Sequence, residues 1–154
     1  TVTLDPETAS PLLSLSPDRR TLRLGDGQQA LPDTPSRFTG SPSVLGSQGF
    51  TAGRHYWELE VGPGDSWAVG VALESVPREA PLSLALGRLW ALRLDWQGQL
   101  SALHSLPAPL PLQGRLRRLR VHLDMEGGTV TFYNAEGMAQ LLQFRASFTE
   151  RVFP

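Results

Sequence analysis

Three histidines are the side chains in this chain whose chemistry best suits metal binding or proton transfer: His55, His104 and His122. A zinc site needs about four nitrogen, sulfur or carboxylate ligands held close together. His55 and His122 fall in alternating, strand-like stretches without a carboxylate or a second histidine at ligand spacing, and the chain has no cysteine. The pattern favours structural or surface histidines, so we expect neither a metal site nor a cofactor.

The other candidates for catalysis are equally incomplete. Asp124 and Glu126 resemble a general acid–base pair, but they flank a turn, and the solvated end of a hairpin is the better interpretation. No serine lies in a G-x-S-x-G nucleophile elbow. The loop GPGDSW at 62–67 lacks the glycine spacing of a phosphate-binding loop and opens no helix. We therefore expect no enzyme activity from this domain.

The basic residues offer one cluster, GRLRRLR at 114–120, in a chain whose fourteen basic residues are all arginines. Such a cluster can attract RNA or an acidic partner. It contains no aromatic residues on which bases would stack, and the formal net charge is −1. A solvated loop and strand edge is the preferred interpretation, with no nucleic acid as partner. No apolar run reaches the ~20 residues that span a bilayer, so no membrane contact is expected.

These side chains must be positioned by short strands. The stretch GRHYWELEVG at 53–62 alternates strictly, with Trp57, Leu59 and Val61 on one side. Fifteen glycines and thirteen prolines cut the chain into comparable runs. The runs that we expect to be strands are 12–16, 21–25, 56–61, 67–73, 88–94, 119–125, 128–134 and 140–145. The pattern predicts an all-β protein, an antiparallel β-sandwich of two packed sheets with little helix.

Turn chemistry supports the same fold. The EGG at 126–128 and the DWQG at 95–98 place glycine where a tight hairpin needs a positive φ. The proline-rich stretch 106–114 cannot be a central strand, so we interpret it as an extended crossing loop. The segments 79–86 and 137–142 have room for a single turn of helix at most. Trp57 is expected in the core, because burial of an indole is strongly favourable.

The order of these motifs resembles the PRY-SPRY family, the C-terminal concanavalin-like β-sandwich of many tripartite-motif ubiquitin ligases and of butyrophilins. The stretches that carry the resemblance are VTLDPETASPLLSLSPDRRTLRLG at 2–25, RFTGSPSVLGSQGFTAGRHYWELEVG at 37–62, WAVGVA at 67–72, LWALRL at 89–94 and LDMEGGTVTFYNA at 123–135. Five ordered motifs at family spacing are a specific signal. The resemblance implies a single domain over 1–154, with a PRY segment at 1–43 and a SPRY segment at 44–154.

The chain departs from the family pattern in three places. Members continue through another strand or two where this chain ends at Phe153 and Pro154, so the last strand is expected to be missing. Met125 stands where an aromatic residue is usual, and a flexible methionine can fill that space. The loop PREAPLSLALGR at 77–88 replaces a basic segment.

The resemblance implies a non-catalytic protein-interaction module, the substrate-recognition domain of a tripartite-motif-type E3 ubiquitin ligase. The ligase chemistry, and a coiled coil that makes the full-length protein a homodimer, would lie outside this chain. The expected compartment is the cytoplasm, with the nucleus as a second. Protein partners would dock on loops and on the strands beneath them. The segments that match this face are 26–42, 62–68, 74–88 and 93–97, and Phe148 matches a pocket-lining aromatic.

The strand LWALRL and the DW that follows it give the sharpest site hypothesis. By alternation, Arg93 and Asp95 point away from the side of Leu92 and Leu94. We predict a pocket with Arg93 at its centre, Asp95 beside it, and Trp96 and Phe148 as apolar walls. The alternative is that Arg93 and Asp95 only neutralise each other. The full predicted partner-binding set is Arg37, Ala68, Arg78, Arg88, Arg93, Asp95, Trp96 and Phe148.

Two other functions remain open at this stage. A butyrophilin-type domain that senses a small phosphorylated ligand would need several basic side chains to converge on one pocket, for which Arg37, Arg78, Arg88 and Arg93 are the candidates. A carbohydrate-binding module would need an exposed aromatic platform beside acids, for which Trp96 is the candidate.

Overall fold

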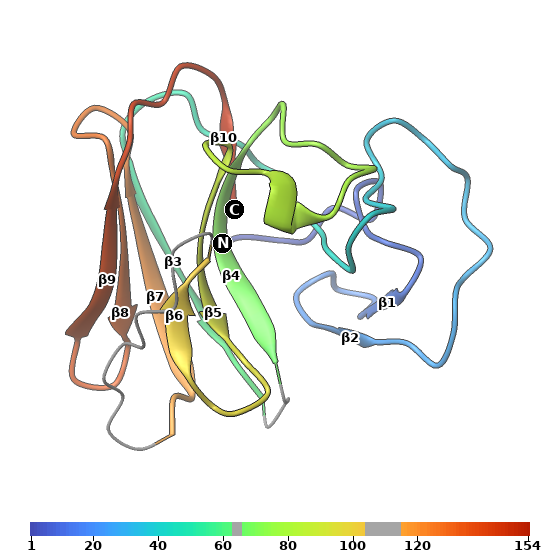
Figure 1. The fold of residues 1–154 in the computed structure, drawn as a ribbon, viewed down its shortest axis with the longest axis horizontal. Helices are drawn as coiled ribbons and strands as arrows, with labels where there is room; N and C mark the ends of the chain where they lie inside the picture. The colour runs from blue at the N-terminus through green and yellow to red at the C-terminus, as the bar shows by residue number, and fades with distance from the viewer. Residues whose placement is uncertain (63–65, 104–114) are drawn as a thin grey trace.

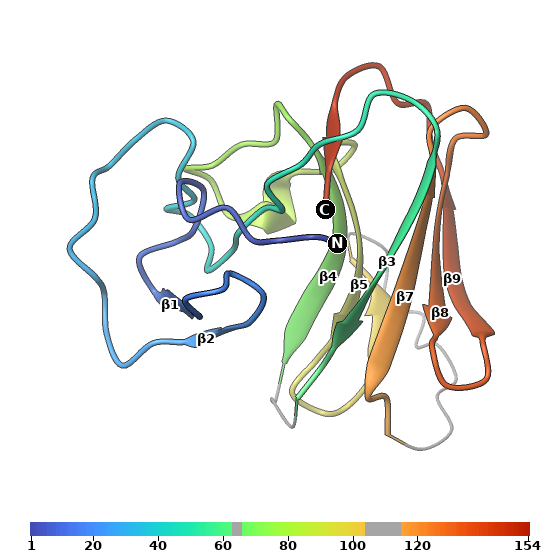
Figure 2. The same cartoon turned by 180° about the vertical axis from the view of Figure 1, so that it is seen from behind.

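The computed structural model describes residues 1–62, 66–103 and 115–154, and their elements form three layers (Figures 1 and 2). The first sheet has the order β3 (Arg54–Glu60), β7 (Arg118–Asp124), β8 (Thr129–Asn134) and β9 (Ala139–Arg145). The second has the order β10 (Val152–Phe153), β4 (Trp67–Leu73), β5 (Leu89–Leu94) and β6 (Leu100–Ala102). The third layer holds the hairpin of β1 (Leu13–Leu15) and β2 (Leu22–Leu24), and the 3-10 turn η1 (Leu82–Leu84).

All strand pairs are antiparallel, and the predicted all-β sandwich with little helix is confirmed. The interior between the two four-stranded sheets is filled by alternate residues of each strand. Trp57, opposite Val121 in the β3–β7 register, packs there as expected, and Met125 packs against the same cluster. The buried members of this main core are Val71, Leu73, Leu92, Leu100, Leu116, Leu119, Val121, Leu123, Val130, Phe132 and Val152.

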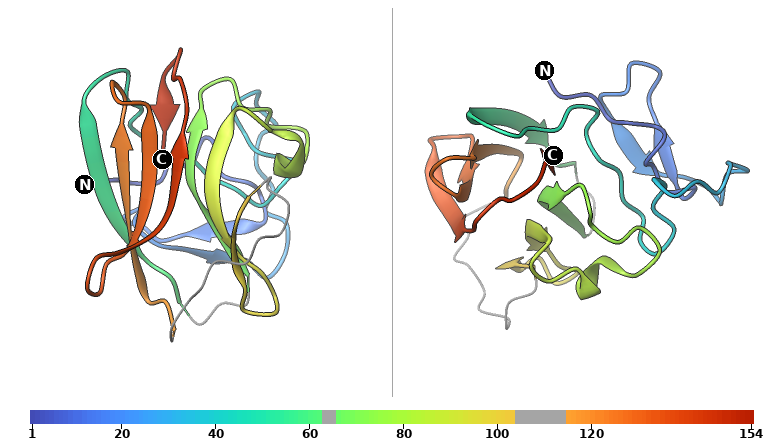
Figure 3. Two further views of the ribbon diagram at one scale, coloured as in Figure 1. Left: turned by 60° about the vertical axis from the view of Figure 1, so that its left-hand side comes forward. Right: turned by 90° about the horizontal axis from the view of Figure 1, so that it is seen from above.

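A second, smaller core joins the β4–β5 sheet to the third layer. Phe38 and Leu45, from the N-terminal part of the chain, are buried against Ala72 on the outer side of β4. Val76 and Ala85, from the segment that carries η1, complete the cluster. Figure 3 shows this layer on one side of the sandwich, and it does not cover the outer side of the β3–β9 sheet. The two sheets therefore present different outer faces.

Each of the eight expected runs overlaps a strand, while β6 and β10 were not predicted. These two strands have three and two residues, too few to display an alternation of apolar and polar residues. The 3-10 turn η1 lies inside the segment 79–86, whereas 137–142 contributes to β9. The proline-rich stretch 106–114, His104 and residues 63–65 of the loop 62–67 lie outside the described residues. The PRY and SPRY boundaries at residues 43 and 44, and the missing last strand, stay predictions.

The two ends of the chain meet at residues 46 and 47. The Gly46 amide donates to the Pro154 carbonyl at 2.9 Å, and the Ser47 amide donates to the Thr3 carbonyl at 2.8 Å. Val2 and Pro154 both lie within van der Waals reach of a Cβ placed on Gly46. Figure 1 shows N and C on the same part of the molecule. No helix in the described part of the chain is long and apolar enough to cross a membrane.

Candidate functional site

One part of the predicted site is an exposed surface in the structure. It is the outer side of β4, β5 and β6, away from the second core. Ala68 is paired with Arg93, and Arg93 with Ser101, so the three side chains form one cross-strand row, here called the Arg93 face. Ala68 and Arg93 are exposed. Arg93 makes no hydrogen bond or ion pair with any residue that the structure describes. The row places an unpaired guanidinium on a rigid strand.

Small residues keep this face flat. Gly70 follows Ala68 on the outer side of β4 and is paired with Ala91 of β5. A Cβ on Gly70 would lie 2.0 Å from the Trp90 carbonyl oxygen and 2.6 Å from the Ala91 Cα, so no larger residue fits without a shift of the backbone. The close approach of the two strands thus depends on the glycine.

Asp95 does not accompany Arg93 in a pocket. One oxygen of the Asp95 carboxylate, Oδ1, accepts hydrogen bonds from the amides of Gln97 and Gln99, both at 2.9 Å. Gly98, at φ +78°, completes this predicted turn. Trp96 stands at its tip with 77% of its surface exposed. Asp95 therefore shapes the β5–β6 turn, and the alternative in which Arg93 and Asp95 neutralise each other is not seen either.

Phe148 lies on the other side of the β4–β5 sheet from Arg93. Its ring meets Trp90 edge to face, with 5.3 Å between the centroids, and it packs against the main core. Trp90 shares the inner side of β5 with Leu92, whereas Arg93 points outward. The predicted pocket with Phe148 as a wall around Arg93 is therefore not assembled, because alternation along β5 separates the two side chains.

Arg37 donates hydrogen bonds to backbone carbonyls and is not available to a partner. Only 5% of its surface is exposed. Its Nε donates to the Pro32 carbonyl at 2.9 Å, and its Nη1 donates to the carbonyls of Pro6 at 3.0 Å and Ala9 at 2.7 Å. One buried guanidinium thus ties together three stretches of the third layer.

Arg78 has a comparable structural role. It donates to the carbonyls of Ser36 at 2.6 Å, Glu74 at 3.0 Å and Val76 at 3.1 Å, and its guanidinium lies over the Phe38 ring. Burial lowers the pKa of Arg78 below the usual value for arginine.

The four candidate arginines for a phosphate site do not converge. Arg88 remains on the surface with one long hydrogen bond, 3.3 Å from its Nη1 to the Ser75 carbonyl. Arg37 and Arg78 are engaged by backbone carbonyls, and Arg93 stands alone on its face. The arrangement offers no anion site built from this set.

Exposed leucines are functional candidates that the sequence did not single out. Leu22 and Leu24 of β2 expose 45% and 67% of their surface, and Leu12 and Leu31 of the same layer are also exposed. The run TLRLG predicted a strand, but a strand pattern does not say which of its sides is buried. The third layer therefore carries an apolar surface that alternation alone could not assign.

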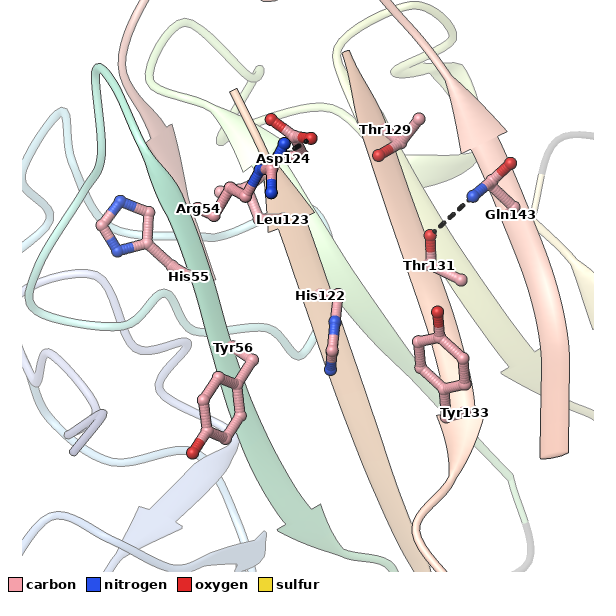
Figure 4. Close-up of a pocket in the computed structure, with 10 residues that line it drawn as sticks. All are labelled: Arg54, His55, Tyr56, His122, Leu123, Asp124, Thr129, Thr131, Tyr133 and Gln143. Carbon is pink, nitrogen blue, oxygen red and sulfur yellow. Dashed lines mark hydrogen bonds and ion pairs between the residues drawn. The ribbon is translucent and has the colours of Figure 1, made fainter. Parts of the chain in front are cut away.

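A second candidate site is an open pocket of about 400 Å³ on the outer side of the β3–β9 sheet (Figure 4). Tyr56, His122 and Tyr133 form a row of rings, with centroids 5.6 Å apart for Tyr56 and His122 and 4.9 Å apart for His122 and Tyr133. Thr131 accepts a hydrogen bond from Gln143 beside them. Burial, and then Arg120, lower the pKa of His122, so this imidazole is neutral at pH 7.

The remaining predicted residues have structural partners. His55 stacks on Phe50 at 3.8 Å, and its Nε2 lies 2.7 Å from the Ala52 carbonyl oxygen. Glu126 accepts the Gly53 amide, which agrees with a hairpin end and not with an acid pair. Arg118 and Arg120 both pair with Glu58, so two arginines of the cluster lie beside an acid. Within the described ranges no group of three or more histidines and carboxylates is placed to hold a metal ion.

Comparison with known proteins places this geometry in a family. The family models for the SPRY-associated domain (PRY) and for the SPRY domain match residues 2–50 and 54–154. The E3 ubiquitin-protein ligase TRIM69 of Rattus norvegicus is 47% identical over 99% of this chain and 31% of its own length. Butyrophilin subfamily 1 member A1 of Bos taurus is 44% identical over 99% of this chain and 29% of its own length. The chain thus spans less than a third of these relatives.

A solved structure gives the same result for the fold. The crystal structure of the TRIM65 PSpry domain superimposes with a TM-score of 0.81 at 27% sequence identity. The match covers 99% of this chain and 81% of that one.

Proposed function

Because the chain belongs to the PRY-SPRY family, whose domains are protein-binding modules, we propose that it is the substrate-recognition domain of a tripartite-motif-type E3 ubiquitin ligase. The domain itself is non-catalytic. The ligase chemistry and a coiled coil for homodimerisation would belong to other parts of a longer protein. We place that protein in the cytoplasm, with the nucleus as a second compartment.

The observation that carries the proposal is the exposed, unpaired Arg93 on a rigid strand. Its neighbour Ala68 is too short to cover it, and no described residue pairs with it. A guanidinium held in this way offers a planar set of donors that matches a carboxylate in two hydrogen bonds. A partner that presents an aspartate or glutamate to the Arg93 face would therefore gain both affinity and orientation.

The similarity to a butyrophilin raises the alternative that the domain binds a small phosphorylated ligand, but the positions of the arginines do not favour it. Such a ligand would need several cations at one place, and Arg37 and Arg78 are occupied by backbone carbonyls. The single exposed cation of the Arg93 face suits one carboxylate on a protein surface better.

We expect Arg93→Glu to weaken partner binding about 10- to 100-fold, because it turns attraction for a carboxylate into repulsion. The measurement is quantitative capture from cell lysate with the purified domain, followed by calorimetry on the captured protein. Arg145→Glu is the matched control, since Arg145 is also an exposed strand arginine, but on the β3–β9 sheet. Partners that bind wild type, Arg93→Glu and Arg145→Glu equally well would refute a role for this face.

A second candidate function, saccharide binding, is favoured by the pocket in Figure 4. Tyr56 exposes 64% of its surface there, on the same outer side of β3 as Glu58, and the Arg120 guanidinium lies over its ring, 5.0 Å from the centroid. Arg54 pairs with Asp124, so their opposite charges balance in the pocket. An exposed ring beside neutral and charge-balanced polar groups suits a sugar ring, which combines apolar C–H faces with hydroxyl groups.

We expect lactose, maltotriose or chitotriose to shift the amide resonances of β3 and β7 at millimolar concentration, and Tyr56→Ser to weaken that binding at least 5-fold. The control is Trp96→Ser, which removes an exposed aromatic ring from the β5–β6 turn, outside the pocket. This variant should bind the sugars like wild type. The absence of shifts in β3 and β7 with all three sugars would eliminate this function.

A further inference from the structure

We propose that the outer edge of β2 is a docking strand that pairs with an extended, acidic segment of the partner protein. The inference rests on the proposed protein-binding function and adds a second contact to it, at the hairpin of β1 and β2. The alternation of hydrogen bonds along this hairpin, the exposure of its leucines and the charges around it are three separate observations that support the proposal.

The hydrogen bonds of the hairpin show which backbone groups point outward. The Gly25 amide donates to the Leu12 carbonyl at 2.8 Å, and the Ser16 amide donates to the Thr21 carbonyl at 2.9 Å. Hydrogen-bonded pairs recur every second residue in an antiparallel ladder. Ser14 and Arg23 are therefore also a hydrogen-bonded pair, whereas Leu13–Leu24 and Leu15–Leu22 are not. The backbone groups of Leu22 and Leu24 therefore point away from β1.

The two edges of the hairpin differ. On the β1 edge the Leu13 amide donates to the Ser10 carbonyl at 3.1 Å, and the Leu13 carbonyl accepts Gln29 Nε2 at 2.9 Å. On the β2 edge the amides of Leu22 and Leu24 have no hydrogen-bond partner among the residues that the structure describes. The Leu24 carbonyl accepts Arg23 Nη1 at 3.3 Å. An edge with unpaired backbone donors is a template for a further strand. Figure 2 shows β2 along the lower rim of its layer.

The side chains of this edge specify apolar residues at alternate positions. Leu22 and Leu24 lie on the same side of the hairpin as their cross-strand neighbours Leu15 and Leu13. Leu13 is buried, whereas Leu22 and Leu24 are exposed. A docked strand with apolar side chains two residues apart would cover both leucines and extend an existing apolar surface.

The charges around the edge select an acidic segment. Arg19, Arg20 and Arg23 are exposed, and none of them belongs to an ion pair in the described part of the chain. The nearby Asp18 is engaged locally, where its carboxylate accepts the Ser16 hydroxyl and the Arg20 amide. Carboxylates on the docked strand would meet three cations.

The same charges argue against a second copy of this chain as the occupant. Two β2 strands could pair antiparallel through the outward backbone N–H and C=O groups of Leu22 and Leu24. In that register Leu22 of one copy lies opposite Leu24 of the other. The same register places Arg23 directly opposite its own symmetry mate. Like charges in that position destabilise a strand pair. The edge is thus suited to another protein.

The test uses a defined probe, the blocked peptide Glu-Val-Glu-Val-Glu-Val-Glu, with Lys-Val-Lys-Val-Lys-Val-Lys as its charge-reversed control. We expect the acidic peptide to slow hydrogen exchange of the Leu22 and Leu24 amides at least 5-fold and the basic peptide to leave it unchanged. Equal protection by both peptides, or by neither, overturns the proposal. Protection that rises with domain concentration in the absence of peptide means self-pairing and overturns it too.

Two variants separate backbone pairing from side-chain contact. Leu24→Pro removes the Leu24 amide, which has no partner within the hairpin, and proline is tolerated on edge strands. Leu24→Ala keeps the amide and removes most of the side chain. We expect the proline variant to lose at least 10-fold in peptide affinity and the alanine variant to lose less, with both melting near wild type. Equal losses would overturn backbone pairing.

The control that separates this inference from the proposed function is Arg93→Glu. We expect this variant to bind the acidic peptide like wild type, because the peptide pairs at β2. If partner capture depends on Arg93 while the peptide fails to protect β2, the docking strand is refuted and the Arg93 face stands. If the peptide docks but no captured partner depends on Arg93, the role of the Arg93 face is refuted and the docking strand stands.

Discussion

Arg37→Leu is expected to lower the free energy of unfolding by about 4 kcal/mol, the largest loss that we expect from a change at a charged residue. The guanidinium is buried, and it satisfies the carbonyls of Pro6, Ala9 and Pro32. A buried carbonyl left without a donor costs about 1 to 3 kcal/mol. The bond to Ala9 is buried, whereas the bonds to Pro6 and Pro32 are partly buried and contribute less. Leucine fills part of the volume but donates nothing.

Urea denaturation followed by tryptophan fluorescence measures this loss. Arg88→Leu is the matched control, because Arg88 is exposed and makes one long hydrogen bond. We expect a change within about 0.5 kcal/mol for that control. If Arg37→Leu and Arg88→Leu unfold at the same urea concentration, Arg37 does not have the structural role that its contacts assign to it.

Gly70→Ala is expected to cost about 3 kcal/mol or more, although it adds a single methyl group. The new Cβ would lie 2.0 Å from the Trp90 carbonyl oxygen and 2.6 Å from the Ala91 Cα. Both atoms belong to the backbone of β5, so the clash is relieved only if β4 and β5 separate. These strands connect the two cores, and their separation weakens both.

Gly62→Ala provides the control for Gly70→Ala. A Cβ at Gly62 meets no atom of the described residues within 4 Å, and the backbone there has no positive φ, so the substitution should be neutral or slightly stabilising. Both variants are compared by thermal melting and urea denaturation. A Gly70→Ala protein as stable as Gly62→Ala would mean that β4 and β5 can move apart at little cost.

The strands and turns could be predicted because their causes are local. Alternation located β3, and glycine after a polar turn located the ends of β5 and β7, where Gly98 and Gly128 have positive φ as expected. Trp57 reached the core for the same reason. Strands β6 and β10 escaped prediction, since two or three residues carry no period and their pairing is set by distant partners.

The candidate site was predictable only in part. The sequence located Arg93 and its outward direction correctly, but it could not show that Phe148 reaches the inner side of the sheet from another segment. It also could not distinguish a buried arginine from an exposed one. Arg37 and Arg78 have their carbonyl partners in segments remote in sequence, so only the folded chain shows that their charges are occupied.

The meeting of both chain ends at residues 46 and 47 has a mechanical consequence. Tension applied through the two ends would be carried first by the contacts of Gly46 with Pro154 and of Ser47 with Thr3. The two-residue strand β10 would then peel from β4 one hydrogen bond at a time. The broad ladders between β3, β7 and β8 lie outside this path. A domain pulled in this way is expected to yield from its ends inward, and the loss of β10 takes Val152 out of the main core and Phe153 away from the second.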